Sequence, residues 1–198
     1  MRILLDLDEV LCDFVGAACG AWGVRKEEVL RHWEKGVWDL IPPLSRALGR
    51  ERPLLEAEFW DRINGSEMFW AKLEPTPWAR GVLALTQEIT EDWHVISAPS
   101  SCVSSYCGKV RWLKRFFGIR FDRFAITPHK EIFAGESVIL IDDRDTNIER
   151  FCAAGGQGIV FPRHHNSEHP YQDNPLARLS EVLEKTACVY KKEVPSWS

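Results

Sequence analysis

The sequence predicts an α/β fold in which helices cover both faces of a parallel sheet. Five short apolar segments alternate with segments of helical periodicity, which is the pattern of a doubly wound sheet. A long tryptophan-rich stretch, residues 14–76, shows helical spacing and no alternating strand pattern. Carboxylate and lysine side chains follow several apolar segments, where open α/β sheets place their ligands.

The individual elements are expected from this alternation. The predicted strands cover residues 3–5, 93–99, 124–127, 137–141 and 158–161. The predicted helices cover residues 15–22, 25–33, 53–63, 78–89, 109–117, 147–154 and 176–185. Residues 100–108 are small and polar and are predicted to form a loop, Pro42-Pro43 a turn, and the polar tail beyond residue 185 a disordered segment.

The chain is expected to have two parts. A core of residues 1–13 and 77–198 would carry the sheet, and residues 14–76 would form a small helical cap inserted after the first strand. The aromatic residues of this insert have two explanations. Most would fill its small core, whereas one or two could line a cleft and stack on a flat ligand.

The composition is that of an ordinary globular chain of 198 residues, 45% hydrophobic and 27% charged, with a formal net charge of −4. The acidic balance and the lack of a long basic run argue against a long nucleic-acid partner. No apolar run approaches the roughly 18 residues of a membrane span, and no signal-peptide pattern is seen. We therefore expect a cytoplasmic protein without a membrane partner.

The six cysteines show no C-x-x-C pair and no zinc-ligand spacing. We expect reduced thiols, as is usual inside cells. The alternative, that Cys102 and Cys107 form a redox pair, is the weaker interpretation.

The first apolar run ends in Asp6 and Asp8. Residues two apart on a strand point to the same side, so both carboxylates would lie together at the carboxyl end of this strand. Two like charges this close repel and call for a counter-ion, usually a metal. The alternative is a polar strand exit with two solvated acids.

Similar residues follow three other predicted strands. Ser97 ends the second, Lys130 follows the third, and Asp142-Asp143 end the fourth. In a doubly wound sheet these ends converge on one crevice. Carboxylates suit Mg²⁺, and a lysine with a hydroxyl suits a phosphoryl group. The alternatives are an exposed loop lysine for Lys130 and an ordinary strand-end hydroxyl for Ser97.

These residues resemble the four motifs of haloacid dehalogenase (HAD) superfamily phosphatases, in the same order. Within that superfamily the chain is most similar to the 5′(3′)-deoxyribonucleotidases. The local matches are residues 7–14 (LDEVLCDF), 36–38 (GVW), 69–75 (FWAKLEP) and 140–144 (LIDDR). The resemblance implies a HAD-like three-layer Rossmann-type sheet with a small helical cap inserted after the first strand.

The sequence also departs from the family pattern. Glu9 stands where the superfamily usually has glycine, which could alter the turn. Ser97-Ala98-Pro99 stands where the nucleotidases have threonine-serine-proline, and Val37 stands where they have an aromatic residue. These changes bear on the substrate more than on the reaction.

The resemblance implies roles for the motif residues. Asp6 would be the nucleophile, and Asp8 would protonate the leaving group and later take a proton from water. Mg²⁺ would be held by Asp6, the backbone carbonyl of Asp8 and Asp143, with Asp142 close by. Lys130 would bridge Asp6 and the phosphate.

The resemblance also implies the substrate contacts. Ser97, Ala98, Lys109 and Lys130 would bind the phosphate, although Lys109 could instead be a solvated surface lysine. Phe14 and Trp38 would sandwich a base, with simple cap packing as the alternative. A group of histidines has no standard metal spacing and is expected to lie in a solvated loop: His164, His165 and His169.

The expected activity is that of a Mg²⁺-dependent phosphomonoesterase that removes phosphate from (deoxy)nucleoside monophosphates. Two alternatives stay open: a 3′-phosphatase on oligonucleotide ends, and a catalytically silent HAD-fold binding protein. The intact set of Asp6, Asp8, Lys130 and Asp143 disfavours the silent protein. The sequence leaves open the preferred base and sugar, and whether the chain forms a homodimer.

Overall fold

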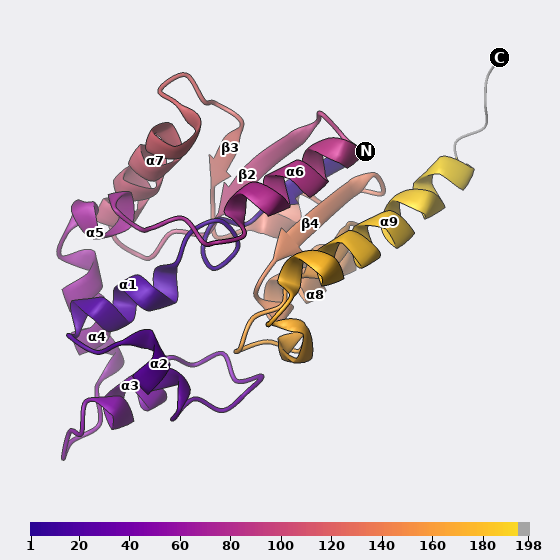
Figure 1. The fold of residues 1–198 in the computed structure, drawn as a ribbon. Coiled ribbons are helices and arrows are strands. Elements are labelled where there is room, and N and C mark those ends of the chain that lie inside the picture. Colours follow the sequence, from indigo (N-terminus) through magenta and orange to yellow (C-terminus); the bar gives the residue numbers. More distant parts are fainter. Residues whose placement is uncertain (194–198) are drawn as a thin grey trace.

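The computed structural model describes the backbone of residues 1–193 and the side chains of residues 1–186. A five-stranded parallel sheet in the order β3-β2-β1-β4-β5 forms its centre (Figure 1). The strands are β1 (Arg2–Leu5), β2 (Trp93–Ser97), β3 (Phe124–Ile126), β4 (Val138–Asp142) and β5 (Gln157–Val160). The α/β prediction is confirmed. Because β1 is the central strand, its apolar residues are buried on both faces.

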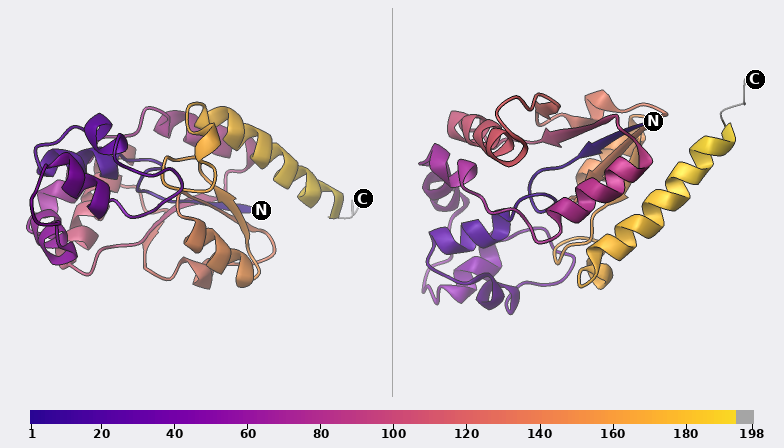
Figure 2. Two further views of the ribbon diagram at one scale, coloured as in Figure 1. Left: turned by 90° about the horizontal axis from the view of Figure 1, so that it is seen from below. Right: turned by 45° about the horizontal axis from the view of Figure 1, so that its top comes forward.

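Alternate residues of β1 point into two separate apolar clusters. Ile3 and Leu5 belong to the larger cluster, which includes residues of three helices outside the stretch 14–76, and Leu4 belongs to a smaller one with Ile148 and Phe151. These three helices are α6 (Ala79–Ile89), α7 (Val103–Phe117) and α9 (Pro175–Glu193). The smaller cluster is covered by α8 (Asp145–Ala153), which lies across the sheet from α9 in the left view of Figure 2.

Residues 14–76 form a lobe of short helices after β1, coloured indigo to purple in Figure 1. They are α1 (Phe14–Ala21), α2 (Lys26–Leu30), α3 (Ile41–Ala47), α4 (Glu56–Asn64) and α5 (Glu67–Ala71). Helices this short are marginal alone, so tertiary packing must stabilise them. The buried side chains of Trp33, Phe59 and Trp70 join the larger apolar cluster and supply that packing.

The two chain segments that connect this insert to the core run side by side. The amide of Asp13 donates to the carbonyl of Glu74 (2.8 Å), and the amide of Thr76 donates to the carbonyl of Leu11 (3.0 Å). The Thr76 hydroxyl also donates to the carbonyl of Val10 (2.9 Å). These bonds fix the point at which the insert leaves the sheet.

Three local predictions are wrong. α7 begins at Val103, so most of the predicted loop 100–108 is helical. Pro42-Pro43 is not a turn but lies in the first turn of α3. Backbone amides there have no acceptor within the helix, so the missing N–H of proline breaks no helical hydrogen bond. The predicted disorder beyond residue 185 is wrong as far as residue 193, because α9 continues to there; residues 194–198 lie outside the described part.

The early start of α7 has a tertiary cause. A Cβ on Gly108 would lie 2.6 Å from the Glu67 carbonyl oxygen and well inside contact distance of the Trp70 Cβ. The missing side chain therefore lets α5 pack directly against α7. This packing stabilises a helical turn that its serine-rich sequence does not favour. Within the described residues, every helix is too short or too polar to span a bilayer.

Candidate active site

Lys130 connects the carboxyl ends of β1 and β4. It begins a short 3-10 helix, η1 (Lys130–Phe133), and is 3% exposed. Its Nζ lies 2.6 Å from Asp6 Oδ1 and 2.6 Å from Asp142 Oδ2. The interpretation of Lys130 as an exposed loop lysine is therefore wrong. The buried ammonium offsets part of the negative charge that the two carboxylates bring out of water.

Asp142 and Asp143 have different partners although they are neighbours in the chain. The Asp142 carboxylate accepts hydrogen bonds from the Arg144 amide (2.9 Å) and from Asn147 Nδ2 (3.0 and 3.1 Å). Asp143 Oδ2 lies 2.7 Å from His165 Nε2, and both side chains are buried. Asp142 thus has several protein donors as partners, whereas Asp143 has a histidine ring as its neighbour.

Lys109 connects the ends of β1 and β2. Its side chain is completely buried, and its Nζ donates to Ser97 Oγ (2.9 Å), to the Ala98 carbonyl (2.7 Å) and to Asp8 Oδ2. The ring of Trp70, on α5, covers the ammonium with its centroid 5.1 Å away. The interpretation of Lys109 as a solvated surface lysine is wrong.

The two lysines bring the strand-end residues together in one place. One links Asp6 to Asp142, and the other links Asp8 to Ser97. Asp6 and Asp8 leave the same strand end, so the two sets of contacts adjoin. The convergence expected from the sequence is present, while the chemical role of each residue stays a prediction.

The cluster is crowded with negative charge. Burial raises the pKa of Asp6 well above its usual range; Lys130 opposes this rise, and Asp142 and Asp143 add to it. Burial, with Asp142 next, likewise raises the pKa of Asp143. Burial lowers the pKa of His165 to about 4, so this ring is neutral at neutral pH. A further positive charge would relieve the repulsion between the carboxylates.

The donor set fits a hard cation. Within residues 1–186, Asp6, Asp142 and Asp143 each offer a buried carboxylate oxygen, and these oxygens lie within 4.8 Å of one another. Asp6 Oδ1 is buried and accepts no hydrogen bond from the described residues, although Lys130 Nζ is at ion-pair distance. Mg²⁺ takes one or two carboxylates and keeps other positions for water or phosphate oxygens.

Comparison with known proteins identifies the family. A family model described as 5′ nucleotidase, deoxy (pyrimidine), cytosolic type C protein matches residues 1–175. The chain belongs to this family. The nucleotidase is therefore a phosphoric monoester hydrolase.

Two relatives agree with this assignment, and two solved structures share the fold. The nucleotidase is 26% identical over 189 residues to the human mitochondrial 5′(3′)-deoxyribonucleotidase, covering 90% of this chain and 77% of the relative. It is 28% identical to the mouse mitochondrial protein, covering 90% and 80%. A HAD family hydrolase from Deinococcus radiodurans R1 has the same fold, with a TM-score of 0.53, 16% identity and coverage of 93% and 95%. A hydrolase from Streptococcus pneumoniae TIGR4 also has this fold, with a TM-score of 0.54, 13% identity and coverage of 92% of this chain and 97% of the other.

Trp38 of the nucleotidase is half exposed beside the acidic cluster. Its ring lies 4.7 Å from the guanidinium of Arg144 and meets the ring of His165 edge-on, with centroids 4.7 Å apart. Arg144 directly follows Asp143, so Trp38 contacts the residues that adjoin the predicted metal ligands. Trp38, which is predicted to bind a base, is therefore close to the acidic cluster of Asp6, Asp142 and Asp143.

Phe14 packs inside the insert. It stacks on Trp70 with centroids 5.5 Å apart and an interplanar angle of 16°, and it also contacts the rings of Trp60 and Phe69. These contacts are those expected for the packing alternative. The nucleotidase thus holds Phe14 through its own aromatic residues, and base stacking on Phe14 stays a prediction.

The loop after β5 is not the solvated loop expected from its prolines and histidines. His165 is 4% exposed and Asn166 is fully buried. Asn166 Nδ2 donates to the carbonyls of Asp143 and Phe161, both at 2.7 Å. His164 Nε2 lies 2.8 Å from the Trp33 carbonyl of the insert. The signal that could have found this loop is its position, because it follows the carboxyl end of a fifth parallel strand.

Glu9, which stands where the superfamily usually has glycine, has a backbone conformation that favours glycine. Glu9 has a φ of 57° and is buried. Burial alone would raise the pKa of its carboxyl, but Lys26 and Arg163 outweigh this effect and lower the pKa to about 2. Glu9 and Arg163 are site-adjacent residues that sequence reasoning did not identify as partners.

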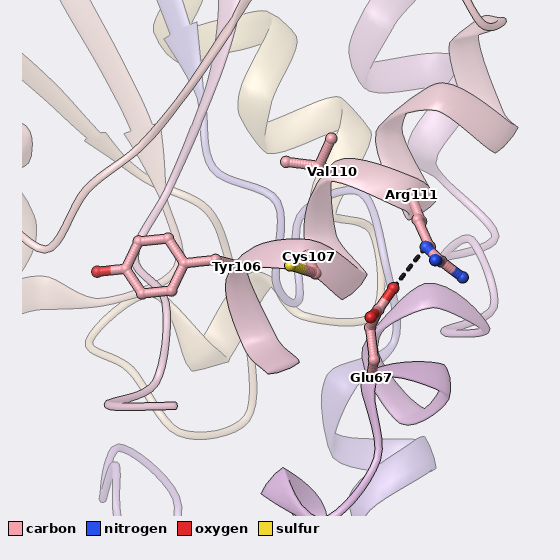
Figure 3. A pocket seen from close by; sticks show the side chains of 5 residues that line it. All are labelled: Glu67, Tyr106, Cys107, Val110 and Arg111. Atoms are coloured by element: carbon pink, nitrogen blue, oxygen red, sulfur yellow. Dashed lines mark ion pairs between the residues drawn. The ribbon is translucent and has the colours of Figure 1, made fainter. Parts of the chain in front are cut away.

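A surface pocket lies apart from the acidic cluster, between α5 and α7 (Figure 3). Its volume is about 360 Å³, and Arg111 pairs with Glu67 across one side (2.5 Å) while Tyr106 points away from that pair. Cys107 lines the pocket as a free thiol, and Cys102 is also free. The five cysteines whose side chains are described are all free, and Cys188 lies outside the described side chains.

Proposed function

We propose that the nucleotidase removes phosphate from (deoxy)nucleoside monophosphates by way of an aspartyl-phosphate on Asp6, with Mg²⁺ as its cofactor. The observation that supports this most strongly is the position of Lys130, 2.6 Å from both Asp6 and Asp142, beside the contact between Lys109 and Asp8. The names of the human and mouse relatives support a deoxyribonucleotide substrate.

The residues allow a two-step reaction. Asp6 attacks phosphorus, so that an Asp6 O–P bond forms and the bond from phosphorus to the ester oxygen breaks. Asp8 gives its proton to the leaving alkoxide. In the second step Asp8 takes a proton from water, which attacks phosphorus and releases inorganic phosphate and free Asp6. Lys109 contacts Asp8 and Ser97 and can balance charge on the phosphate oxygens.

A Mg²⁺ ion would be held by Asp6, Asp143 and the backbone carbonyl of Asp8, with Asp142 close by. It would supply the positive charge that lets an anionic carboxylate approach an anionic phosphate. Lys130 keeps a pKa above its ordinary value, because Asp142 and Asp6 outweigh the effect of burial. It therefore remains charged and holds the Asp6 carboxylate in place at neutral pH.

The insert would act as a cap over this centre, formed by residues 14–76 on a core of residues 1–13 and 77–198. Trp38 would contact the base, and the Ala98 position, which lacks a hydroxyl, would leave phosphate binding to Ser97 and the two lysines. A cytoplasmic location is part of the same proposal, and cell fractionation with a mitochondrial marker tests it.

A phosphate-release screen tests the function. Wild-type protein with Mg²⁺ is given 5′- and 3′-nucleoside monophosphates, sugar phosphates and oligonucleotides with a 3′-phosphate. We expect phosphate release from nucleoside monophosphates that is lost with EDTA and in Asp6→Asn. Release should be kept in Asp61→Asn, which changes an exposed carboxylate on α4. Faster release from oligonucleotide ends would overturn the substrate class, and unchanged activity of Asp6→Asn would overturn the mechanism.

A further inference from the structure

Glu9 lies where the core meets the insert, directly after Asp8. It is 2% exposed, and its φ of 57° lies in the left-handed region that side chains other than glycine rarely adopt. A buried residue in such a conformation persists where its surroundings fix it. The contacts of the Glu9 carboxylate are therefore the interactions that could hold this residue in its conformation.

The Glu9 carboxylate bridges the two parts of the molecule. On the core side, Oε2 accepts hydrogen bonds from Arg163 Nη2 (2.6 Å) and Nε (3.1 Å). On the insert side, Oε1 accepts a hydrogen bond from the Val15 amide of α1 (2.7 Å), and Lys26 Nζ of α2 lies 3.5 Å from Oε2. Both Arg163 nitrogens donate to the same carboxylate oxygen, and such charge-assisted hydrogen bonds are stronger than neutral ones.

Both ends of this bridge are anchored. The guanidinium of Arg163 lies over the ring of Trp78, 4.3 Å from its centroid, and Trp78 Nε1 donates to the carbonyl of Val10 (3.0 Å). On the insert, Lys26 Nζ also pairs with Asp13 Oδ1 (2.6 Å). A shift of the insert against the sheet would separate charged groups that have little access to water.

The segment that follows Arg163 contacts the insert a second time. The Gly36 amide donates to the His164 carbonyl (2.9 Å), and the rings of Trp33 and Trp38 pack against His165. The position of Arg163 therefore helps to set the position of Trp38 relative to the acidic cluster.

We propose that Glu9 is a positioning residue that holds the insert over the acidic cluster of Asp6, Asp142 and Asp143. It acts through a clasp made of Glu9, Arg163, Lys26 and the amide of Val15. Its effect on catalysis rests on the proposed function, because the clasp would set the contact between Trp38 and the base. Its effect on the insert itself does not depend on any activity.

Amide hydrogen exchange tests the clasp without a substrate. In Glu9→Gln and Glu9→Gly, exchange of residues 14–38 is expected to rise at least tenfold, while exchange of β1 and β4 stays within twofold of wild type. Both variants lose the carboxylate, but glycine adopts a positive φ without strain whereas glutamine does not. Comparing them separates the effect of the carboxylate from that of the backbone strain. Glu27→Gln, an exposed charge loss on α2, is the matched control. If the Glu9 variants fail to fold, the half-buried Lys26→Gln is expected to give about a threefold rise.

Exchange in residues 14–38 that stays at the wild-type rate would overturn the proposal, as would an equal rise in the strands. Kinetics provide a second readout: the ratio of kcat/KM for a nucleoside monophosphate to kcat/KM for p-nitrophenyl phosphate should fall about tenfold in Glu9→Gln. A general loss of stability would lower both values together and leave the ratio unchanged, which would overturn the role in positioning Trp38. If wild-type protein hydrolyses neither compound, the proposed function fails and the exchange result still decides the clasp.

Discussion

Replacing Lys130 by methionine should destabilise the nucleotidase in a pH-dependent way. Lys130 Nζ lies 2.6 Å from each of two buried carboxylates, those of Asp6 and Asp142. Methionine keeps most of the volume but removes the charge, so the carboxylates lose their shared partner. Removing one member of a buried ion pair costs about 3–5 kcal/mol, and we expect a loss of this size in the free energy of unfolding at pH 8.

The sign of the pH dependence follows from the raised pKa of Asp6. Without Lys130 this pKa rises further, so the folded variant binds protons that the unfolded chain releases. Stability contributed by a carboxyl with a raised folded pKa falls as pH rises through that pKa. The loss in Lys130→Met should therefore be smaller at pH 5.5 than at pH 8.

Urea unfolding followed by tryptophan fluorescence, in EDTA at both pH values, measures this difference. Lys185→Met on α9 is the control, because its pair with Glu181 is solvent-exposed and should contribute at most about 0.5 kcal/mol. A loss below about 1 kcal/mol at pH 8, or a larger loss at pH 5.5, would contradict the role given to Lys130.

Four further outcomes are expected. Lys109→Met should lower kcat by about 10²–10³-fold, because it removes a buried donor beside Asp8 and Ser97. The circular dichroism spectrum should be retained, and turnover at the wild-type rate would contradict this role. Gly108→Ala should lower the unfolding free energy by about 1–3 kcal/mol, because the new methyl group would clash with α5; an unchanged urea midpoint would count against that packing. Saturating Mg²⁺, at about 100 times its Kd, should raise the Tm by about 5–10 °C in wild type and not in Asp143→Asn, so equal shifts would place the ion elsewhere. The pKa of Glu9 is about 2 in the folded protein and 4.5 at its ordinary value, so its contribution to stability is complete above pH 4.5 and is lost toward pH 2. Between pH 7 and pH 3.5 the free energy of unfolding of wild type should fall by about 1.4 kcal/mol more than that of Glu9→Gln. Equal losses in the two proteins, measured by urea unfolding, would refute this.

The sheet and the convergence of its strand ends could be predicted because both follow from local patterns. Each strand is a short apolar run, and the parallel arrangement places the ends of β1 and β4 side by side. The acids at those ends, Asp6 and Asp142 among them, then had to meet.

The surroundings of Lys109 could not be predicted in the same way. Its partners Asp8 and Trp70 are distant in sequence, and its burial depends on the close approach of α5 at Gly108. The serine-rich start of α7 favours a loop when considered alone, so tertiary packing decides its conformation.

The loop after β5 and Glu9 show a similar limit. Prolines and polar residues around His165 indicate a solvated loop, yet Asn166 satisfies backbone carbonyls that would otherwise be buried without donors. Glu9 adopts a conformation that favours glycine, and the partner of its carboxylate, Arg163, is far away in the sequence. Neither pairing leaves a local signal.

The central claim is that Asp6 takes up the phosphoryl group, and one burst experiment tests it most directly. Asp8→Asn is mixed with p-nitrophenyl phosphate and Mg²⁺, because this leaving group needs no proton from Asp8 while the second step still needs one removed from water. The expected result is a burst of one p-nitrophenol per active site, with one phosphoryl group added to the peptide that contains Asp6. Phosphate and p-nitrophenol released in step, with no modified peptide, would contradict the covalent route.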